Sequence, residues 1–232
     1  MTVYKVIKID ERISQDVLAD AQTEELYSTA CLLKHNGRFL SILTSGRSLM
    51  PDSAVIEEEN FSKGFPKNRS FNFSDAKIWD SFIEKSMKPP TSEAIEALES
   101  MATEKGIRRD NMEEEADRKN FSSLIGRGGG LTPSGDDFLG GALMAAAAFS
   151  DDFFNEISQA VSNNLANTSD LSAHFLEHAL AGRGGEDIIL LFRALSIGDI
   201  KTIRQLFLRI VSYGETSGMF IIKGMLWLLQ QI

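Results

Sequence analysis

The chain has 232 residues, of which 33 are acidic and 24 are basic, so its formal net charge is −9. This acidic balance argues against a nucleic-acid partner, because phosphate neutralisation needs clustered Lys and Arg, and against an anionic membrane surface. Apolar residues make up 43% of the chain, enough to bury a core, and the length predicts one domain or two intimately packed halves.

No targeting or membrane segment is expected. The sequence does not start with the charged and apolar regions of a signal peptide, and its apolar runs are shorter than a bilayer requires. Its one cysteine, Cys31, excludes an intrachain disulfide and is expected to be a small core residue. These features predict a cytoplasmic protein.

The first third of the chain is β-rich. Residues 3–9 alternate with a period of about two, and the runs 28–34 and 38–44 flank Asn36-Gly37. Asn-Gly between two such runs predicts a hairpin with a type I′ turn. A further strand is expected near residues 54–57.

The middle of the chain predicts a loop and then a helix. Residues 59–72 are polar and contain Gly64 and Pro66, and Ser74 is a helix cap. The predicted helix ends at Pro89. Its apolar face comprises Ile78, Trp79, Phe82 and Ile83.

The rest of the chain is helical. Helices are expected to open at Thr91, to include Glu113, and then to span residues 134–149, 151–165, 170–181, 186–196, 199–212 and 217–231. The predicted fold class is α+β, a small antiparallel β unit followed by a mainly helical bundle. We assign residues 1–75 to the β-rich part and 76–232 to the helical part, together forming one compact unit.

A glycine-rich stretch at residues 126–137 carries the densest functional signal. Its glycines let backbone N–H groups approach a ligand, and Thr132 is expected to cap a helix whose first residue is Pro133. Free N–H groups and the positive end of the helix dipole favour an anion there, and Arg127 could hold a phosphate or carboxylate. The alternative is a glycine loop before an ordinary buried helix.

Two carboxylates follow in the same stretch. Asp136 and Asp137 suit the first turn of a helix, but they would repel a bare anion. They could instead bind an amine or amide, hold a hydrated Mg²⁺, or act as a general base. We predict that both are catalytic and that no cofactor is needed, with Mg²⁺ as the alternative.

A second loop, residues 212–218, also leads into an apolar helix and could face the first motif across a pocket. It could equally be a simple helix cap. The predicted substrate-binding residues of the two loops are Arg127, Gly128, Gly129, Gly130, Leu131, Thr132, Ser134, Gly135, Glu215, Thr216, Ser217 and Gly218.

The spacing His174, Glu177, His178 matches the H-x-x-E-H pattern of zinc peptidases. Two imidazoles at i and i+4 share a helix face, and Glu186 or Asp187 could supply a third ligand. The pattern also arises by chance in helices, so a zinc hydrolase is a weaker alternative.

The string GLTPSGDD at residues 130–137 resembles the signature of the AllH-like family, which includes the AllH subunit associated with oxamate carbamoyltransferase of anaerobic allantoin breakdown. Residues 38–56, 167–169 and 214–218 look similar to further family stretches. Two positions depart from the family pattern: Glu215 replaces a common His, and Met219 or Phe220 stands where an Asp is common.

The resemblance implies phosphorolysis of oxalurate to oxamate and carbamoyl phosphate, or the reverse, by a chain that acts with separately encoded subunits. Arg127 and the glycines would hold phosphate, and Asp136 or Asp137 would exchange a proton. The expected ligand is a small anionic or ureido metabolite. A non-catalytic ligand-binding or assembly subunit with the same pocket is the main alternative.

Overall fold

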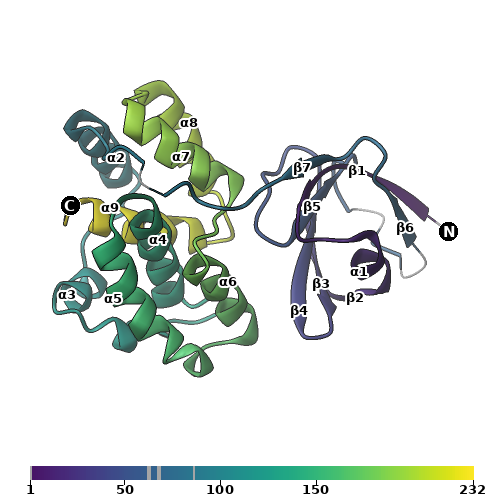
Figure 1. Cartoon of the computed structure of the whole chain (residues 1–232), viewed down its shortest axis with the longest axis horizontal. Coiled ribbons are helices and arrows are strands. Elements are labelled where there is room, and N and C mark those ends of the chain that lie inside the picture. Colours follow the sequence, from purple (N-terminus) through teal and green to yellow (C-terminus); the bar gives the residue numbers. More distant parts are fainter. Residues whose placement is uncertain (1, 62–63, 67–68, 86) are drawn as a thin grey trace. The chain divides into compact units, whose positions relative to one another are not determined.

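The structure is a computed structural model that describes residues 2–61, 64–66, 69–85 and 87–232. The chain divides into two compact units, Met1–Ser81 and Phe82–Ile232 (Figure 1). Among the described residues, the first unit contains the strands and one short helix, and the second is helical. The predicted α+β class is therefore confirmed.

The first unit is built on a curved seven-stranded sheet with the order β2-β3-β4-β5-β1-β6, and β7 pairs with β1. One short helix, α1 (Gln15–Asp20), buries Leu18. The strands are β1 (Thr2–Asp10), β2 (Gln22–Leu26), β3 (Ala30–His35), β4 (Arg38–Leu43), β5 (Ser53–Ile56), β6 (Arg69–Asn72) and β7 (Lys77–Trp79).

The Asn-Gly hairpin forms where the sequence predicts it. Strands β3 and β4 pair antiparallel up to His35 opposite Arg38. Between them, Asn36 and Gly37 have φ values of 48° and 83°, as a type I′ turn requires. Cys31 on β3 is fully buried in the apolar core, and this burial raises the pKa of its thiol to about 11. The cysteine is thus a core residue with an unreactive thiol.

Two expectations for the first unit are wrong. The sheet is mixed, because β4–β5, β1–β6 and β1–β7 are parallel pairs. The described residues after Ser74 do not form the expected helix, and Lys77–Trp79 is instead a strand beside β1. The apolar residues of this stretch satisfy a helical period, but pairing with an existing strand edge supplies backbone partners that a short helix lacks.

The second unit contains α2 (Ser92–Glu104), α3 (Asn111–Asp117), η1 (Phe121–Leu124), α4 (Ser134–Phe149), α5 (Asp151–Ser162), η2 (Leu165–Asn167), α6 (Asp170–Leu180), α7 (Glu186–Ile197), α8 (Ile200–Ile210) and α9 (Ser217–Leu229). The helix starts predicted from the sequence agree closely with these bounds. Thr91 caps α2, for example, with its hydroxyl accepting from the N–H of Ala94 at 3.2 Å.

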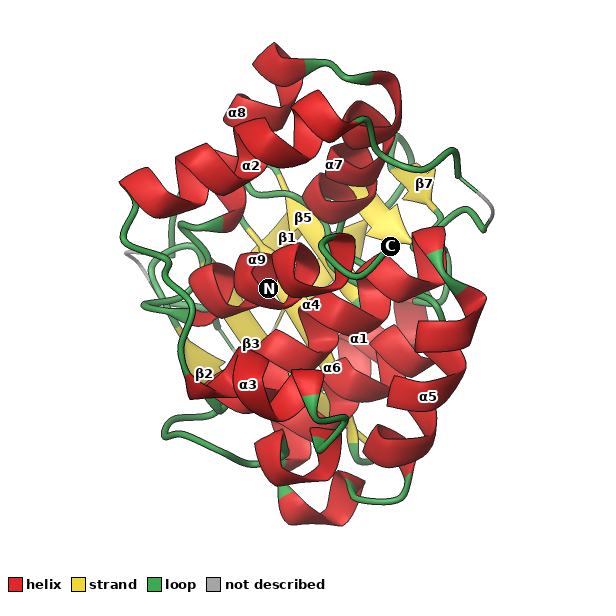
Figure 2. Ribbon diagram, turned by 90° about the vertical axis from the view of Figure 1, so that its left-hand side faces the viewer, coloured by secondary structure: helices red, strands yellow, loops and turns green. Residues whose placement is uncertain are grey.

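Helices α4 and α9 lie side by side within the helical unit (Figures 1 and 2). Their contact depends on glycine, because a Cβ at Gly141 would lie 2.1 Å from the Ile221 carbonyl oxygen, and one at Gly224 would lie 1.9 Å from that of Phe138. Buried Trp227 of α9 packs against three phenylalanine rings: Phe121, Phe138 and Phe153. The close approach brings the first turns of α4 and α9 together.

No helix among the described residues is long and apolar enough to cross a bilayer.

Candidate functional site

The glycine loop, residues 126–133, connects η1 to α4 and has a backbone that needs glycine. Gly126 and Gly128 have φ values of 71° and 113°, which L side chains rarely adopt. A Cβ at Gly126 would lie 2.3 Å from the carbonyl oxygen of Asn167, and one at Gly128 would lie 2.6 Å from Ser134 Oγ. The glycines therefore let the loop fold tightly against α4 and the segment before α6.

The start of α4 differs from the prediction. The helix begins at Ser134 with Pro133 as its N-cap residue, and no side chain caps it. The carbonyl oxygen of Arg127 replaces a side-chain cap, since it accepts from the Gly135 N–H at 2.9 Å and from Ser134 Oγ at 3.3 Å. The Thr132 hydroxyl therefore does not cap α4 and can contact Ser217 instead.

Asp136 is buried and forms hydrogen bonds to three segments of the chain. Its side chain is 2% exposed and accepts from the Gly126 N–H at 2.8 Å and from Ser172 Oγ at 2.7 Å. The hydroxyl of Thr168 donates to the same oxygen as Ser172. Through these three donors Asp136 connects the glycine loop, the segment before α6 and α6 itself.

Asp137 has a different environment one residue later. Its Oδ2 atom is enclosed and has no hydrogen-bond partner among the described residues. Burial raises the pKa of Asp137 to about 7, against the effect of the Ser217 and Thr132 hydroxyls and with the repulsion of Asp136. Near neutral pH this side chain can both give and take a proton.

The two predicted loops meet at this carboxyl group. Thr132 Oγ1 of the glycine loop lies 2.9 Å from Ser217 Oγ, which belongs to the first residue of α9. Gly218 is needed for packing, because a Cβ there would lie 1.8 Å from the Ile210 carbonyl oxygen. The late loop thus contributes Ser217 to the site, whereas Glu215 and Thr216 are exposed.

A third helix start completes the site. Ser169 caps α6 by accepting from the Ser172 N–H at 3.1 Å, and its hydroxyl donates to the Leu131 carbonyl oxygen. The amino ends of α4, α6 and α9 therefore adjoin the glycine loop, and their dipoles favour negative charge there. Sequence reasoning did not place Thr168, Ser169 and Ser172 in the site. The cluster of hydroxyl residues just before and within the first turn of α6 is the sequence feature that could have indicated their place in the site.

The loop also presents unused donors. The backbone amides of residues 128–132 donate to no described residue. The Arg127 side chain is half-buried, and none of the described residues forms an ion pair with it. Gly129, Gly130 and Leu131 are exposed. Six of the twelve predicted binding residues thus lie on one loop, and its amides at residues 128–132 have no partner among the described residues.

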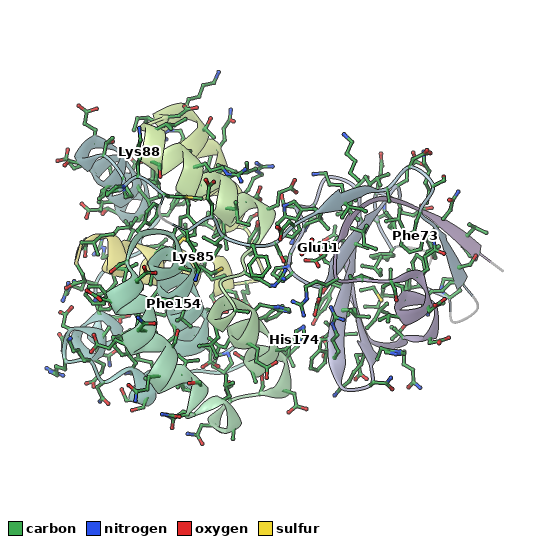
Figure 3. All side chains as sticks on the ribbon, viewed as in Figure 1. Glu11, Phe73, Lys85, Lys88, Phe154 and His174 are labelled. Carbon is green, nitrogen blue, oxygen red and sulfur yellow. The ribbon has the colours of Figure 1, made fainter. Side chains whose placement is uncertain are left out.

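The histidine pair lies elsewhere in the helical unit. His174, labelled in Figure 3, and His178 are neighbours on α6, with their Nε2 atoms 3.2 Å apart. Asp187, one of the two suggested third zinc ligands, is already engaged by Arg209 at 3.1 Å and by the Tyr213 hydroxyl at 2.8 Å. Zinc hydrolysis remains the weaker alternative.

Residues 124–229 match the family model of AllH, described as oxamate carbamoyltransferase subunit AllH. Over this segment the chain is similar to AllH. The AllH match starts at the end of η1 and ends at the end of α9, so it contains the glycine loop and the three adjoining helix starts. Neither a curated protein nor a solved structure matches the chain.

Proposed function

We propose that this chain is a carbamoyltransferase-related enzyme subunit that binds a small anionic or ureido metabolite at the glycine loop. The AllH match supports a relation to a carbamoyltransferase subunit. The observation that carries the assignment to this site is Asp137, a carboxyl group with a pKa of about 7 beside the Thr132 and Ser217 hydroxyls.

The reaction implied by the family gives Asp137 a specific role. When a phosphate oxygen attacks the carbamoyl carbon of oxalurate, a tetrahedral oxyanion forms and the bond to the oxamate nitrogen then breaks. The leaving nitrogen must receive a proton, which protonated Asp137 supplies. In the reverse direction, ionised Asp137 takes the proton from the attacking oxamate nitrogen.

The loop supplies the electrostatic part of the mechanism. Its free amides at residues 128–132 can donate to the oxyanion or to a phosphate oxygen. The Arg127 guanidinium can hold a second anionic group of the substrate. These donors are held in place before the reaction, so little reorganisation is needed in the transition state.

We assign Asp136 a positioning role in place of the catalytic role expected from the sequence. Both of its oxygens accept hydrogen bonds, from Gly126 on one side and from Thr168 and Ser172 on the other. Neither oxygen is therefore left without a protein donor. The function of Asp136 is to hold the glycine loop against α4 and α6.

The test is turnover of oxalurate and phosphate by the chain co-expressed with its separately encoded subunits. Asp137→Asn should lower kcat about 10²- to 10⁴-fold, the usual contribution of a general acid or base, with little change in KM. Asp152→Asn, the same change in the first turn of α5, is the matched control and should keep full activity. Equal activity of Asp137→Asn and the control would show that Asp137 does not transfer the proton.

We propose that this chemistry requires no metal ion. Asp136 is engaged by protein donors, which leaves Asp137 as a single carboxylate at the site. Mg²⁺ usually binds through one or two carboxylates together with substrate phosphates, so the substrate would have to supply the other ligands. Activity should survive EDTA, and restoration by Mg²⁺ of activity lost in EDTA would reverse this assignment.

The alternative is a ligand-binding or assembly subunit that has no catalytic activity of its own. It is favoured by the exposure of Glu215, which stands where a histidine is common in the family and forms no hydrogen bond or ion pair with the described residues. In that case Asp137→Asn would leave the activity of the assembled complex unchanged, while Arg127→Gln would weaken ligand binding. The same co-expressed complex distinguishes the two functions.

A further inference from the structure

We propose that His174 and His178 form a site for one divalent transition-metal ion, which both imidazoles hold through their Nε2 atoms. The site takes Zn²⁺ and similar ions that favour nitrogen ligands, and it uses none of the residues assigned above to the substrate. The ion binds reversibly and takes no part in carbamoyl transfer. The inference is independent of the proposed function, so either can fail without the other.

The helix brings the two imidazoles together. His174 and His178 are four residues apart, and side chains at this spacing lie on the same face of an α-helix, one turn apart. Both belong to α6, whose start is fixed by the Ser169 cap. The backbone therefore holds two nitrogen ligands side by side before an ion arrives, which lowers the entropic cost of binding it.

The distance between the two nitrogens fits a shared ion. Zinc–imidazole bonds of about 2.0 to 2.1 Å in a tetrahedral arrangement put two bound nitrogens about 3.3 to 3.4 Å apart. The Nε2 atoms of His174 and His178 lie 3.2 Å apart. Because the nitrogens already have this separation, the rings need only turn their lone pairs toward the ion.

The ion takes the place of a shared proton. The two rings meet edge-on, with an angle of 79° between their planes, and at 3.2 Å one Nε2 must donate while the other accepts. In the metal-bound form the donating ring carries its proton on Nδ1 instead, so both Nε2 lone pairs face the ion. Both imidazoles stay neutral, and no proton has to leave the pair.

The end of α6 favours a cation. His178 lies in the last turn of the helix, where the dipole is negative, and Glu177 adds a negative charge to the same turn. The side chain of His178 is buried, whereas that of His174 is partly exposed. A hydrated ion therefore reaches the pair from the side of His174.

The ligand atoms select the class of ion. Imidazole nitrogen suits Zn²⁺, Ni²⁺ and Cu²⁺, whereas Mg²⁺ and Ca²⁺ require oxygen ligands. The remaining positions around the ion take oxygen ligands such as water. The histidine pair should therefore bind Zn²⁺ in the presence of excess Mg²⁺.

Calorimetric titration with Zn²⁺ tests the inference on the full chain, purified without a histidine tag and freed of metal with EDTA. We expect the tightest class of sites to hold one Zn²⁺ per chain, and excess Mg²⁺ should not compete. His174→Gln and His178→Gln each remove one of the two nitrogen ligands, so each should weaken this binding by about tenfold or more. Titration with Ni²⁺ should give the same pattern.

His35→Gln is the matched control, because His35 is the third histidine of the chain and lies beside Asn36 in the β3–β4 hairpin. This variant should bind Zn²⁺ as the wild type does. If replacement of buried His178 disturbs the helical circular dichroism spectrum, the partly exposed His174→Gln decides the test.

Three outcomes would overturn the inference. The first is a wild-type chain that binds less than one tight Zn²⁺. The second is the same Zn²⁺ affinity in His174→Gln as in the wild type and His35→Gln. The third is displacement of the tight Zn²⁺ by excess Mg²⁺, which would assign the ion to carboxylates in place of the imidazoles.

Discussion

At the scale of single residues, Asp136 and Asp137 show how environment assigns different chemistry to identical side chains. Asp136 accepts hydrogen bonds on both of its oxygens. Asp137 is enclosed with one oxygen that has no partner among the described residues, and burial raises its pKa. Two neighbouring carboxyl groups thus have different surroundings, and those of Asp137 raise its pKa.

The raised pKa of Asp137 predicts how stability depends on pH. Between about pH 4 and 7 the folded state holds a proton on Asp137 that the unfolded state has lost, so this contribution to stability is present below pH 4 and disappears as pH rises through 7. Asp137→Asn removes the effect. It should exceed the wild type in free energy of unfolding at pH 8, by up to about 4 kcal/mol, with little difference near pH 4.

Denaturant unfolding of both proteins at pH 4, 6 and 8 measures this difference, and the titration of all other groups cancels in the comparison. A difference that stays constant across this range would show that Asp137 ionises normally in the folded protein.

Replacing Asp136 should have the opposite effect on stability. Asp136→Asn substitutes an N–H₂ group for one acceptor of a buried carboxylate that binds three donors. We expect a loss of about 2 to 4 kcal/mol in the free energy of unfolding at pH 7, against a change within about 1 kcal/mol for exposed Asp152→Asn. Unfolding by urea measures both, and equal stabilities would show that the Asp136 junction contributes little.

At the scale of elements, the site depends on how closely α4 and α9 approach each other. Gly141 and Gly224 let the two helix backbones touch, and this contact places Thr132 beside Ser217. The glycines of this helix pair therefore serve packing, whereas Gly126 and Gly128 serve the loop conformation.

Two consecutive glycines of α4 test the importance of this close approach. A Cβ at Gly141 would meet backbone at 2.1 Å, so Gly141→Ala should cost about 2 to 4 kcal/mol. At Gly140 the nearest atom to a new Cβ is Leu176 Cδ2 at 4.0 Å, so Gly140→Ala should stabilise the helix by about 0.5 to 1 kcal/mol. Thermal unfolding of the two variants should give melting temperatures on opposite sides of the wild type. A shift in the same direction would refute the packing account.

At the scale of the whole molecule, the chain consists of two compact units. The helical unit has its own core around Trp227, and the hydrogen bonds described for the glycine loop, α4, α6 and α9 join residues of that unit. The AllH match also lies entirely within it. The candidate site is thus supported by the fold of a single unit.

This organisation predicts that residues 82–232 fold without the first unit. The isolated fragment should give a helical circular dichroism spectrum and a cooperative thermal transition, because it contains a complete apolar core. Gly141→Ala in the fragment should lower the transition temperature as in the full chain. Absence of a cooperative transition would show that the helical unit depends on residues 1–81.

Much of the fold is determined by local sequence. Asn36-Gly37 specifies the hairpin because both residues tolerate positive φ, and the helix starts follow from caps such as Thr91 and Ser169. The residues around Lys77 could not be assigned from sequence, since their apolar pattern suits a helix and only the nearby edge of β1 makes them a strand.

The composition of the site was likewise determined by the sequence, and its chemistry by the tertiary structure. The density of glycine, hydroxyl and carboxylate residues at positions 126–137 predicted the candidate loop, because each of these residue types suits a helix start that binds a ligand. Sequence could not distinguish Asp136 from Asp137, since their difference arises from partners 10 to 80 residues away: Gly126, Thr168 and Ser172 for Asp136, and Ser217 for Asp137. Burial and hydrogen bonding set a pKa, and both exist only once the helices have packed.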